Sequence, residues 1–291
     1  MKLGILTEER DWVSCELERA MKEFNIDPVY ISPPRISSYI GMDIKFKYNK
    51  EDILDLDGIF VRNLGDPINY YRFDVLKYIG EYIPVINPAE ALENAGNKYK
   101  TSSLMDIHRI PHPKTIITED IDKAIIWLEK FKDCVLKPIY GNRGKNISRL
   151  KNKSLISKLN ILNEYKRKYG VIYMQEFIDT PGEEYRDIRA FVIGDEVVSA
   201  MYRISSDWIT NIHQGGRSEK CEITDEIREL AIKAKNAVGL IYGGVDIMEC
   251  KEGGLKVIEV NGAPSWEALS RISNVNISKL LVEYVLENIL K

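Results

Sequence analysis

The sequence predicts a protein that combines an α/β region with an α+β region. Residues 1 to about 86 alternate short apolar strands with amphipathic helical patterns, a rhythm typical of a small parallel sheet. From Val171 onward the pattern becomes rich in strands. The dipeptide Asn87-Pro88 separates the first region from the rest. At 291 residues the chain is long enough for two or three subdomains with cores of their own.

The N-terminal region is expected to contain four strands and two helices. The strands are placed at the short apolar runs 3–6, 28–31, 58–62 and 84–86. The helices follow the amphipathic patterns 14–24, which begins at a Ser cap, and 72–82. The third strand ends in the polar pair Arg62-Asn63. A dinucleotide-binding Rossmann domain is disfavoured because no G-x-G-x-x-G motif follows the first strand.

The remaining elements alternate less regularly. After Pro88 the chain reads as a helix to about residue 106 that is interrupted at Gly96. A buried strand at 134–138 carries Lys137 near its end. The other expected strands cover 114–117, 171–177, 187–194 and 196–204, with a loop at 205–220. The other expected helices cover 119–132, 154–169, 225–238 and 276–290.

Composition and charge exclude several classes of protein. The net charge of −3 gives no reason to expect nucleic acid or an anionic membrane as a partner. Four scattered cysteines without CxxC spacing suit a reducing compartment, and the three histidines show no zinc-ligand spacing. No apolar run approaches the roughly 18 residues of a membrane span, and the N-terminus does not resemble a signal peptide. We therefore expect a soluble, cytoplasmic protein.

The segment 243–264 carries the most information about function. It reads as two alternating strands joined by a Gly-containing hairpin loop. If Cys250 pairs with Leu255 across that loop, counting back along both strands places Asp246 directly opposite Glu259. Two carboxylates that face each other across a ladder repel and destabilise the pairing.

A divalent cation between the two carboxylates would explain their placement. Asn261 lies two residues beyond Glu259 on the same face of its strand and adds a third oxygen. Oxygen ligands of this kind suit Mg²⁺, which usually keeps waters and phosphate oxygens in its shell. The alternative is a solvated hairpin face that carries three polar residues by chance.

A glycine-containing segment follows the strand that bears Lys137. Gly141 and Gly144 allow backbone N–H groups to approach an anion closely, and Arg143 and Lys145 supply positive charge. The order of residues is not that of a Walker motif. The alternative is an exposed turn with basic residues nearby.

Two further segments suit a nucleotide. The strand that ends in 174–178 leads into an acidic loop. A purine would lie against the backbone of this strand, and an acidic side chain of the loop would accept hydrogen bonds from the ribose hydroxyls. Arg203 on a later strand and Asn211 beside a glycine loop suit a transferring phosphoryl group or an oxyanion. The alternatives are an ordinary strand connection for the first segment, and a surface salt bridge with a mobile loop for the second.

In their order along the chain these elements resemble the ATP-grasp superfamily, and more closely its RimK branch of glutamate-adding ligases. The resemblance rests on Lys98, Lys137 with its glycine loop, Gln175-Glu176-Phe177-Ile178, Asp187-Ile188-Arg189, Arg203, Asn211, Asp246 and Glu259-Val260-Asn261. It covers roughly residues 85 to 275. It implies an ATP-grasp fold with an N-terminal parallel-sheet domain, a central α+β lid and a C-terminal antiparallel-sheet domain, at 1–86, 87–170 and 171–291.

The resemblance also implies roles for individual residues. The ATP-binding set would be Lys98, Lys137, Gly141, Gly144, Gln175, Glu176, Phe177, Ile178, Glu183, Asp187 and Arg203. Within it the lysines contact the phosphates, Glu176 to Ile178 form the adenine hinge, and Asp187, in preference to Glu183, meets the ribose. Arg203 and Asn211 would be the catalytic residues that hold the γ-phosphoryl end. Asp246, Glu259 and Asn261 would bind two Mg²⁺ or Mn²⁺ ions, with Glu259 bridging.

The implied reaction makes an amide bond at the expense of ATP. A substrate carboxylate attacks the γ-phosphate to give an acylphosphate and ADP, and an amine then displaces phosphate. The sequence contains no Ser/His/Asp or Cys/His arrangement that would indicate a covalent enzyme nucleophile.

The resemblance implies L-glutamate as the amine and leaves several acceptors open. A pterin coenzyme, tetrahydromethanopterin, is preferred over the polyglutamate tail of a deazaflavin coenzyme and over a carrier or ribosomal protein. Trp208, Trp266, Tyr140 and Tyr202 either stack on a flat heterocycle or pack in the core. A homodimer or homotetramer is implied, and a nucleotide-binding protein without catalysis is disfavoured because the proposed metal ligands and Arg203 are all present.

Overall fold

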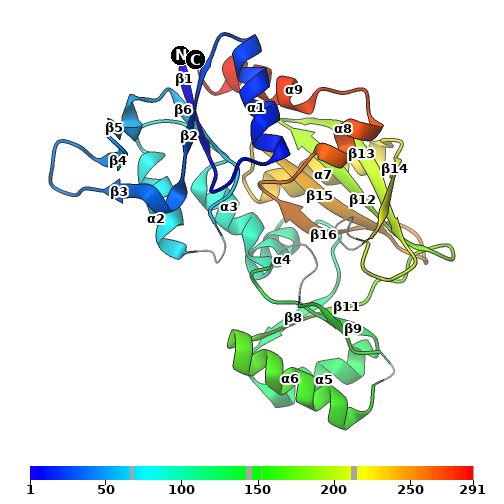
Figure 1. Cartoon of the computed structure of the whole chain (residues 1–291). Coiled ribbons are helices and arrows are strands. Elements are labelled where there is room, and N and C mark those ends of the chain that lie inside the picture. The colour runs from blue at the N-terminus through cyan, green and yellow to red at the C-terminus, as the bar shows by residue number, and fades with distance from the viewer. Residues whose placement is uncertain (66–68, 142–145, 152, 211–214, 291) are drawn as a thin grey trace.

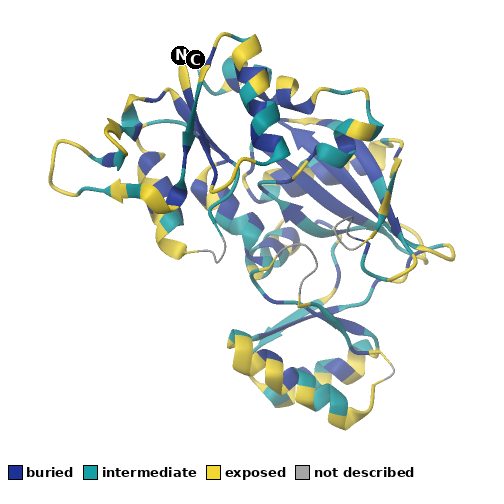
Figure 2. Cartoon of the chain, viewed as in Figure 1, coloured by how far each residue is buried: buried dark blue, intermediate teal, exposed yellow. Residues whose placement is uncertain are grey.

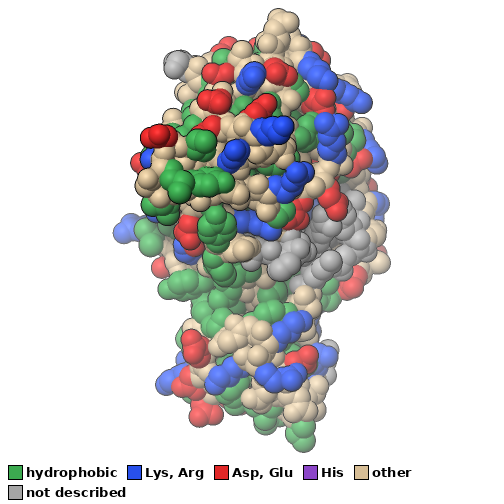
Figure 3. All heavy atoms as spheres, turned by 60° about the vertical axis from the view of Figure 1, so that its left-hand side comes forward, with side chains coloured by type: hydrophobic (Ala, Val, Ile, Leu, Met, Phe, Trp, Pro, Cys, Tyr) green, Lys and Arg blue, Asp and Glu red, His purple; other side chains and the backbone are tan. Residues whose placement is uncertain are grey.

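The computed structural model describes residues 1–65, 69–141, 146–151, 153–210 and 215–290. Their strands form a parallel four-stranded sheet, an antiparallel four-stranded sheet, an antiparallel five-stranded sheet and a small three-stranded sheet. The antiparallel four-stranded sheet and its two helices form a lobe that projects below the rest of the molecule (Figure 1). Charged side chains of both signs are interspersed over the face that Figure 3 presents, which accords with the small net charge.

The N-terminal region forms the parallel sheet that its βαβ rhythm predicts. Its order is β2-β1-β6-β7, with β1 at Lys2–Leu6, β2 at Asp27–Ile31, β6 at Gly58–Val61 and β7 at Val85–Ile86. The flanking helices are α1 at Trp12–Glu23 and α2 at Tyr70–Ile79. Arg62 directly follows the carboxyl end of β6, the edge at which side chains of parallel strands meet.

Both N-terminal helices begin earlier than expected. The cap of α1 is Asp11, whose side chain accepts from the backbone of Ser14, while the Ser14 hydroxyl accepts from the backbone of Asp11. Ser14 is therefore the second member of a capping box and not the cap itself. The helix α2 is capped by Asn69. A small sheet that the sequence pattern does not predict is made of β3 at Ile36–Ser38, β4 at Phe46–Tyr48 and β5 at Glu51–Asp52.

The junction after the parallel sheet is held by a buried asparagine. Asn87 is fully buried, and its side-chain amide donates to the backbone oxygens of Tyr242 and Gly262. Its side-chain oxygen accepts from the backbone of Ile241 and Tyr242. These bonds satisfy the amide in the interior and fasten the end of the first sheet to the C-terminal sheet.

The expected interruption at Gly96 is confirmed. Two helices follow each other there, α3 at Ala89–Gly96 and α4 at Lys98–Ile107, and Asn97 between them caps the second. The central lobe contains β8 (Thr115–Thr118), α5 (Ile121–Phe131), β9 (Cys134–Leu136), β10 (Ser148–Arg149), α6 (Leu155–Tyr169) and β11 (Ile172–Glu176). Because β11 pairs with β8 and β9, this strand belongs to the central sheet, although the expected boundary at residue 170 assigns it to the C-terminal unit. The domain boundaries otherwise stay a prediction.

The C-terminal sheet has the order β14-β13-β12-β15-β16 and is covered on both faces. Its strands are β12 (Tyr185–Ile193), β13 (Glu196–Ser205), β14 (Arg217–Lys220), β15 (Tyr242–Glu249) and β16 (Leu255–Asn261); β14 lies where the sequence predicts a loop. Helix α7 (Asp225–Ala237) packs on one face, and α1 and α9 (Ile277–Asn288) lie on the other, with the short helix α8 (Glu267–Ile272) before α9. Figure 2 shows the strands of this sheet mostly buried. None of the described helices has the length and apolar character needed to cross a bilayer.

Candidate active site

The hairpin of β15 and β16 brings the expected carboxylates together. Asp246 and Glu259 are cross-strand partners, as the sequence predicts. The expected pairing of Cys250 with Leu255 is wrong, because Glu249 pairs with Leu255 and the backbone N–H of Cys250 closes the turn on Gly254.

A β-bulge in β16 reconciles these two observations. The ladder runs from Glu249 opposite Leu255 to Ile247 opposite Val257, and the next pair is Asp246 opposite Glu259. One extra residue, Ile258, therefore enters β16 and shifts the register by one. Bulges are common beside active sites because they bend the strand and re-aim side chains.

Asp246 lies at the centre of a buried charge cluster. Its carboxylate accepts from the guanidinium of Arg189, with Nη2 to Oδ2 at 3.0 Å, and Arg203 Nη2 is 2.8 Å from the same oxygen. Arg203 also forms a bidentate ion pair with Asp187, with Nε to Oδ1 at 2.6 Å and Nη2 to Oδ2 at 2.7 Å. The hydroxyl of Thr210 donates to Asp187 as well. Two arginines and two aspartates from three neighbouring strands thus neutralise one another.

The cluster holds these groups in their charged forms. Burial would raise the pKa of the Asp246 carboxyl, but Arg189 and Arg203 outweigh burial and lower it to about 2. Burial would lower the pKa of Arg203, but Asp187 and Asp246 outweigh it and raise the pKa above its usual range. The strand register explains the arrangement, since Asp187 faces Arg203 and Arg189 faces Asp246 across adjacent ladders.

Arg189 is a site residue that the sequence analysis did not select. It is almost fully buried, it binds Asp246, and it lines a cavity described below. Its spacing of two residues from Asp187 on one strand places both side chains on the same face, and this spacing could have identified it.

Both expected phosphate lysines lie beside the hairpin. Lys98 is the first residue of α4, and its ammonium group is 3.2 Å from Glu259 Oε1 and 3.0 Å from the backbone oxygen of Gly141. Lys137 follows β9 and donates to Gln175 Oε1 at 2.7 Å. Burial lowers the pKa of Lys137 to about 8, and the charge of Glu259 opposes that shift. The lysines of the central region and the carboxylates of the C-terminal sheet therefore meet in space.

The expected adenine hinge connects the lobe to the C-terminal sheet. Glu176 Oε1 accepts from the ammonium group of Lys256 on β16 at 2.7 Å and from the backbone of Lys114 at 3.0 Å. The Phe177 ring lies 3.4 Å from the guanidinium carbon of Arg149. Ile178 is buried. The side chains of the hinge are thus held by contacts with the lobe and with β16.

The other expected residues are distributed less evenly. Glu183 is exposed, and both oxygens of Asp187 accept from Arg203, so the ribose contact stays a prediction. The side-chain oxygen of Asn261 accepts from the backbone of Ala263 at 3.0 Å. Gly144 and Asn211 lie outside the described residues.

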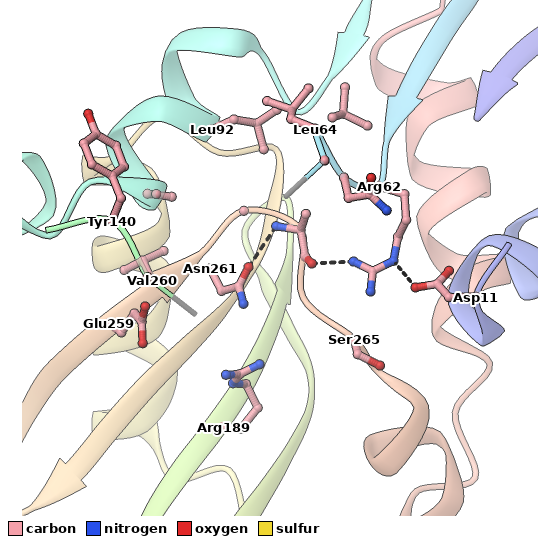
Figure 4. A pocket seen from close by; sticks show the side chains of 18 of the residues that line it. Asp11, Arg62, Leu64, Leu92, Tyr140, Arg189, Glu259, Val260, Asn261 and Ser265 are labelled. Carbon is pink, nitrogen blue, oxygen red and sulfur yellow. Dashed lines mark hydrogen bonds and ion pairs between the residues drawn. The ribbon is translucent and has the colours of Figure 1, made fainter. Parts of the chain in front are cut away.

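A cavity of about 820 Å³ opens between the parallel sheet and the C-terminal sheet (Figure 4). Its wall includes Arg189, Arg203, Glu259 and Asn261. Arg62, at the end of β6, also lines it. The volume lies within the range of small-molecule binding sites.

Arg62 joins two parts of the cavity wall. Its Nε atom donates to Asp11 Oδ2 at 2.8 Å, and its Nη1 atom donates to the backbone oxygen of Ala263, as Figure 4 shows. The loop that follows Asn261 is thereby fastened to the N-terminal domain.

The four aromatic side chains considered as stacking surfaces differ in the structure. Trp266 is buried in the core and donates its indole N–H to Ser278. Tyr202 packs against a buried cluster, and Trp208 makes an edge contact with Phe177. Of the four, Tyr140 lines the cavity.

Comparisons with known proteins agree with this geometry. Residues 95–285 match the RimK-like ATP-grasp domain. The chain is 56% identical to the tetrahydromethanopterin:alpha-L-glutamate ligase of Methanococcus maripaludis, over 98% of both chains. It is 52% identical to the enzyme of the same name from Methanocaldococcus jannaschii, over 99% of both chains.

Solved structures support the fold. The ATP-grasp ligase PsnB with a minimal precursor superposes with a TM-score of 0.77 at 19% identity, over 98% of both chains. Its complex with minimal precursor, Mg and ADP gives 0.72 at 20% identity, over 98% of this chain and 97% of that one. The expected fold and family are confirmed: the chain belongs to the RimK-like ATP-grasp family of ligases.

Proposed function

We propose that the protein is an ADP-forming ligase that joins L-glutamate to a carboxylate of tetrahydromethanopterin. The names of full-length relatives at 56% and 52% identity support this choice of substrates. The observation that carries the reaction class is the meeting of Lys98 and Lys137 with Glu259 beside the cluster of Arg203 and Asp246. The ammonium groups that would bind phosphates and the oxygen atoms that would bind a divalent ion lie close together there.

ATP is proposed to lie between the central lobe and the C-terminal sheet. Glu176 to Ile178 would hold the adenine, and Lys98 and Lys137 would hold the phosphates near Gly141. A lysine ammonium group has three donors, so Lys137 can bind a phosphate oxygen while it keeps its bond to Gln175. Anionic phosphates would also oppose the burial that lowers the pKa of Lys137. Asp187 is proposed for the ribose, with Glu183 as the alternative.

Asp246, Glu259 and Asn261 are proposed to hold Mg²⁺ or Mn²⁺, as two ions. Their oxygens suit a hard cation. Each carboxylate oxygen has two lone pairs, and Asp246 Oδ1 accepts one bond, from Arg189, so this oxygen keeps a lone pair for a metal ion. The described residues contain no group of three His, Cys, Asp or Glu side chains placed for a metal, so nucleotide phosphates and water would complete the shell. Bound divalent ions would neutralise charge on the transferring phosphoryl group.

The chemistry proceeds in two steps. The acceptor carboxylate attacks the γ-phosphorus, ADP leaves, and an acylphosphate forms. The amine of L-glutamate then attacks the acyl carbon, and phosphate leaves as the amide bond forms. Arg203 is held in its charged form by Asp187 and Asp246, so it can stabilise negative charge on the phosphoryl group without reorienting.

The purified protein should release ADP from ATP in the presence of L-glutamate and tetrahydromethanopterin, and mass spectrometry should find one added glutamyl unit on the pterin. Modification of only a deazaflavin coenzyme or only a carrier protein would overturn the choice of acceptor. Light scattering in the same preparation checks the predicted homodimer or homotetramer.

A further inference from the structure

The cavity wall has two chemically different sides. Arg189 and Ser265 lie on one side, and Leu64, Leu92 and Tyr140 lie on the other (Figure 4). Tyr70 packs against Tyr140, and the lining also includes Phe73, Ala95, Gly96 and Pro138. A single glutamate would fill only part of a cavity of about 820 Å³, and nothing in glutamate matches an apolar wall of this extent.

Two tyrosines form the most distinctive part of the apolar side. Tyr70 begins α2, and Tyr140 follows β9, so they come from the N-terminal domain and from the central region. Their rings meet edge to face, with centroids 5.4 Å apart and an interplanar angle of 83°. The Tyr140 hydroxyl accepts from Asn97 Nδ2 at 2.8 Å, which fixes the ring.

The tyrosine pair is placed for a ligand and not for the core. Tyr70 is 55% exposed, whereas Phe73 and Leu92, which also line the cavity, are each 8% exposed. Tyr140 is half-buried, so both rings keep accessible surface that a flat ring of a ligand can cover. A flexible peptide would gain less from such a surface than a planar ring would.

We propose that this apolar wall, with Tyr70 and Tyr140 at its edge, receives a planar ring of the acceptor while the acceptor's reacting carboxylate lies toward Arg189. The inference rests on the proposed function and adds to it a basis for acceptor choice: a carboxylic acid that carries a flat ring system remote from the reacting group. Tyr70 is then a specificity-determining residue.

Steady-state kinetics of Tyr70→Ala tests the proposal with tetrahydromethanopterin as the probe. The KM for tetrahydromethanopterin should rise about tenfold, while the KM values for ATP and L-glutamate stay unchanged. Tyr70→Phe keeps the ring and should remain near the wild-type KM. Tyr71→Ala is the matched control, because Tyr71 is the next residue of α2, is 51% exposed and does not line the cavity.

A truncated acceptor separates ring binding from a general disturbance. A fragment that keeps the reacting carboxylate and lacks the rings should show the same KM with the wild type and with Tyr70→Ala. An equal loss for both acceptors, or an unchanged KM for tetrahydromethanopterin, would overturn the inference. A wild type that glutamylates neither acceptor would instead overturn the proposed function.

Filling the cavity provides a second, independent variant. A Cβ at Gly96 would meet open space within 4 Å, so a larger side chain there should be accommodated by the fold. Gly96→Phe should raise the KM for tetrahydromethanopterin and leave the fragment unaffected. An unchanged KM for the full acceptor with a correctly folded Gly96→Phe would also contradict the proposal.

Discussion

The two sides of the candidate active site hold their charges in different ways. On the C-terminal sheet, Arg203 and Asp246 are buried and satisfy each other and their neighbours across adjacent strands. On the central side, Lys98 and Lys137 each reach out from the end of an element and make one or two contacts. The charged groups of the sheet side are thus paired with one another before any ligand binds. The lysines of the central side keep hydrogen-bond donors that a ligand can use. Preorganised charge suits the reacting phosphoryl group, and spare donors suit the nucleotide that brings it.

Removal of Arg203 should have the largest effect. Arg203→Ala leaves Asp187 buried without its ion-pair partner and removes one of the two arginines that bind Asp246, which should cost about 3–5 kcal/mol of unfolding free energy. Urea unfolding measures the loss. The matched control is Arg217→Ala, because Arg217 pairs with Glu184 at the surface, where both side chains are about half exposed. That control should leave the urea midpoint close to the wild-type value. Similar losses in the two variants would show that burial does not distinguish these pairs.

Glu259→Gln should affect catalysis and spare the fold. The Glu259 side chain is 37% exposed, so its neutral isostere should fold normally. The kcat for ADP release should fall about a hundredfold or more, because a charged oxygen ligand is lost. Titration with Mg²⁺ should also require higher concentrations. Full activity in Glu259→Gln would refute the metal assignment.

Deprotonation of Lys137 as the pH rises should weaken ATP binding and increase the free energy of unfolding. The folded pKa is about 8, below the ordinary value of 10.5. As pH rises through about 8, the folded protein loses this proton while the unfolded chain keeps it, so this group makes the free energy of unfolding rise up to the unfolded pKa. ATP affinity should fall over the same range, because the neutral amine no longer attracts phosphate.

Binding of a non-hydrolysable ATP analogue at several pH values measures the second effect. Lys137→Met should bind weakly and show less dependence on pH in this range. If Lys137→Met kept the wild-type pH profile, the titrating group would have to be another one.

Loss of the pair between Lys256 and Glu176 should have the smallest effect. This ion pair is partly exposed, and other contacts also reach the C-terminal hairpin, among them the pair of Lys251 with Asp179 and the backbone bond from Val257 to Pro111. Lys256→Met should cost about 0.5–1 kcal/mol and raise the KM for ATP only modestly. A loss as large as that of Arg203→Ala would mean that the hinge, and not the buried cluster, holds the site together.

Much of this site could be predicted because strands have a strict period of two. The facing of Asp246 and Glu259 and the position of Asn261 follow from alternation along a hairpin. The bulge at Ile258 could not be predicted, because a Gly-containing loop allows more than one length and only the assembled ladder selects one. The turn differs from the expected one by one residue, and the bulge at Ile258 shifts the register by one residue in the opposite sense. Asp246 therefore still faces Glu259.

Long-range contacts account for most of what the sequence did not reveal. Arg62 was expected at a strand end. Its hydrogen bond to the backbone oxygen of Ala263 joins residues that are 201 positions apart in the sequence. The core position of Trp266 depends on Ser278 and on the neighbouring sheet. Local periodicity carries no information about such partners, whereas the parallel sheet and the helix break at Gly96 are local and were predicted.

The packing of α1 against α9 bears on how the chain folds during synthesis. Leu17 and Met21 on α1 share a core with Leu281 and Val285 on α9, and the described ends of the chain lie side by side (Figure 1). α9 (Ile277–Asn288) leaves the ribosome long after α1 (Trp12–Glu23), so the apolar face of α1 stays without its partner until α9 has been synthesised. Domains usually fold as they emerge, and exposed apolar surface on a waiting segment favours aggregation. We therefore expect a chaperone to cover the apolar face of α1 on the nascent chain until α9 has emerged.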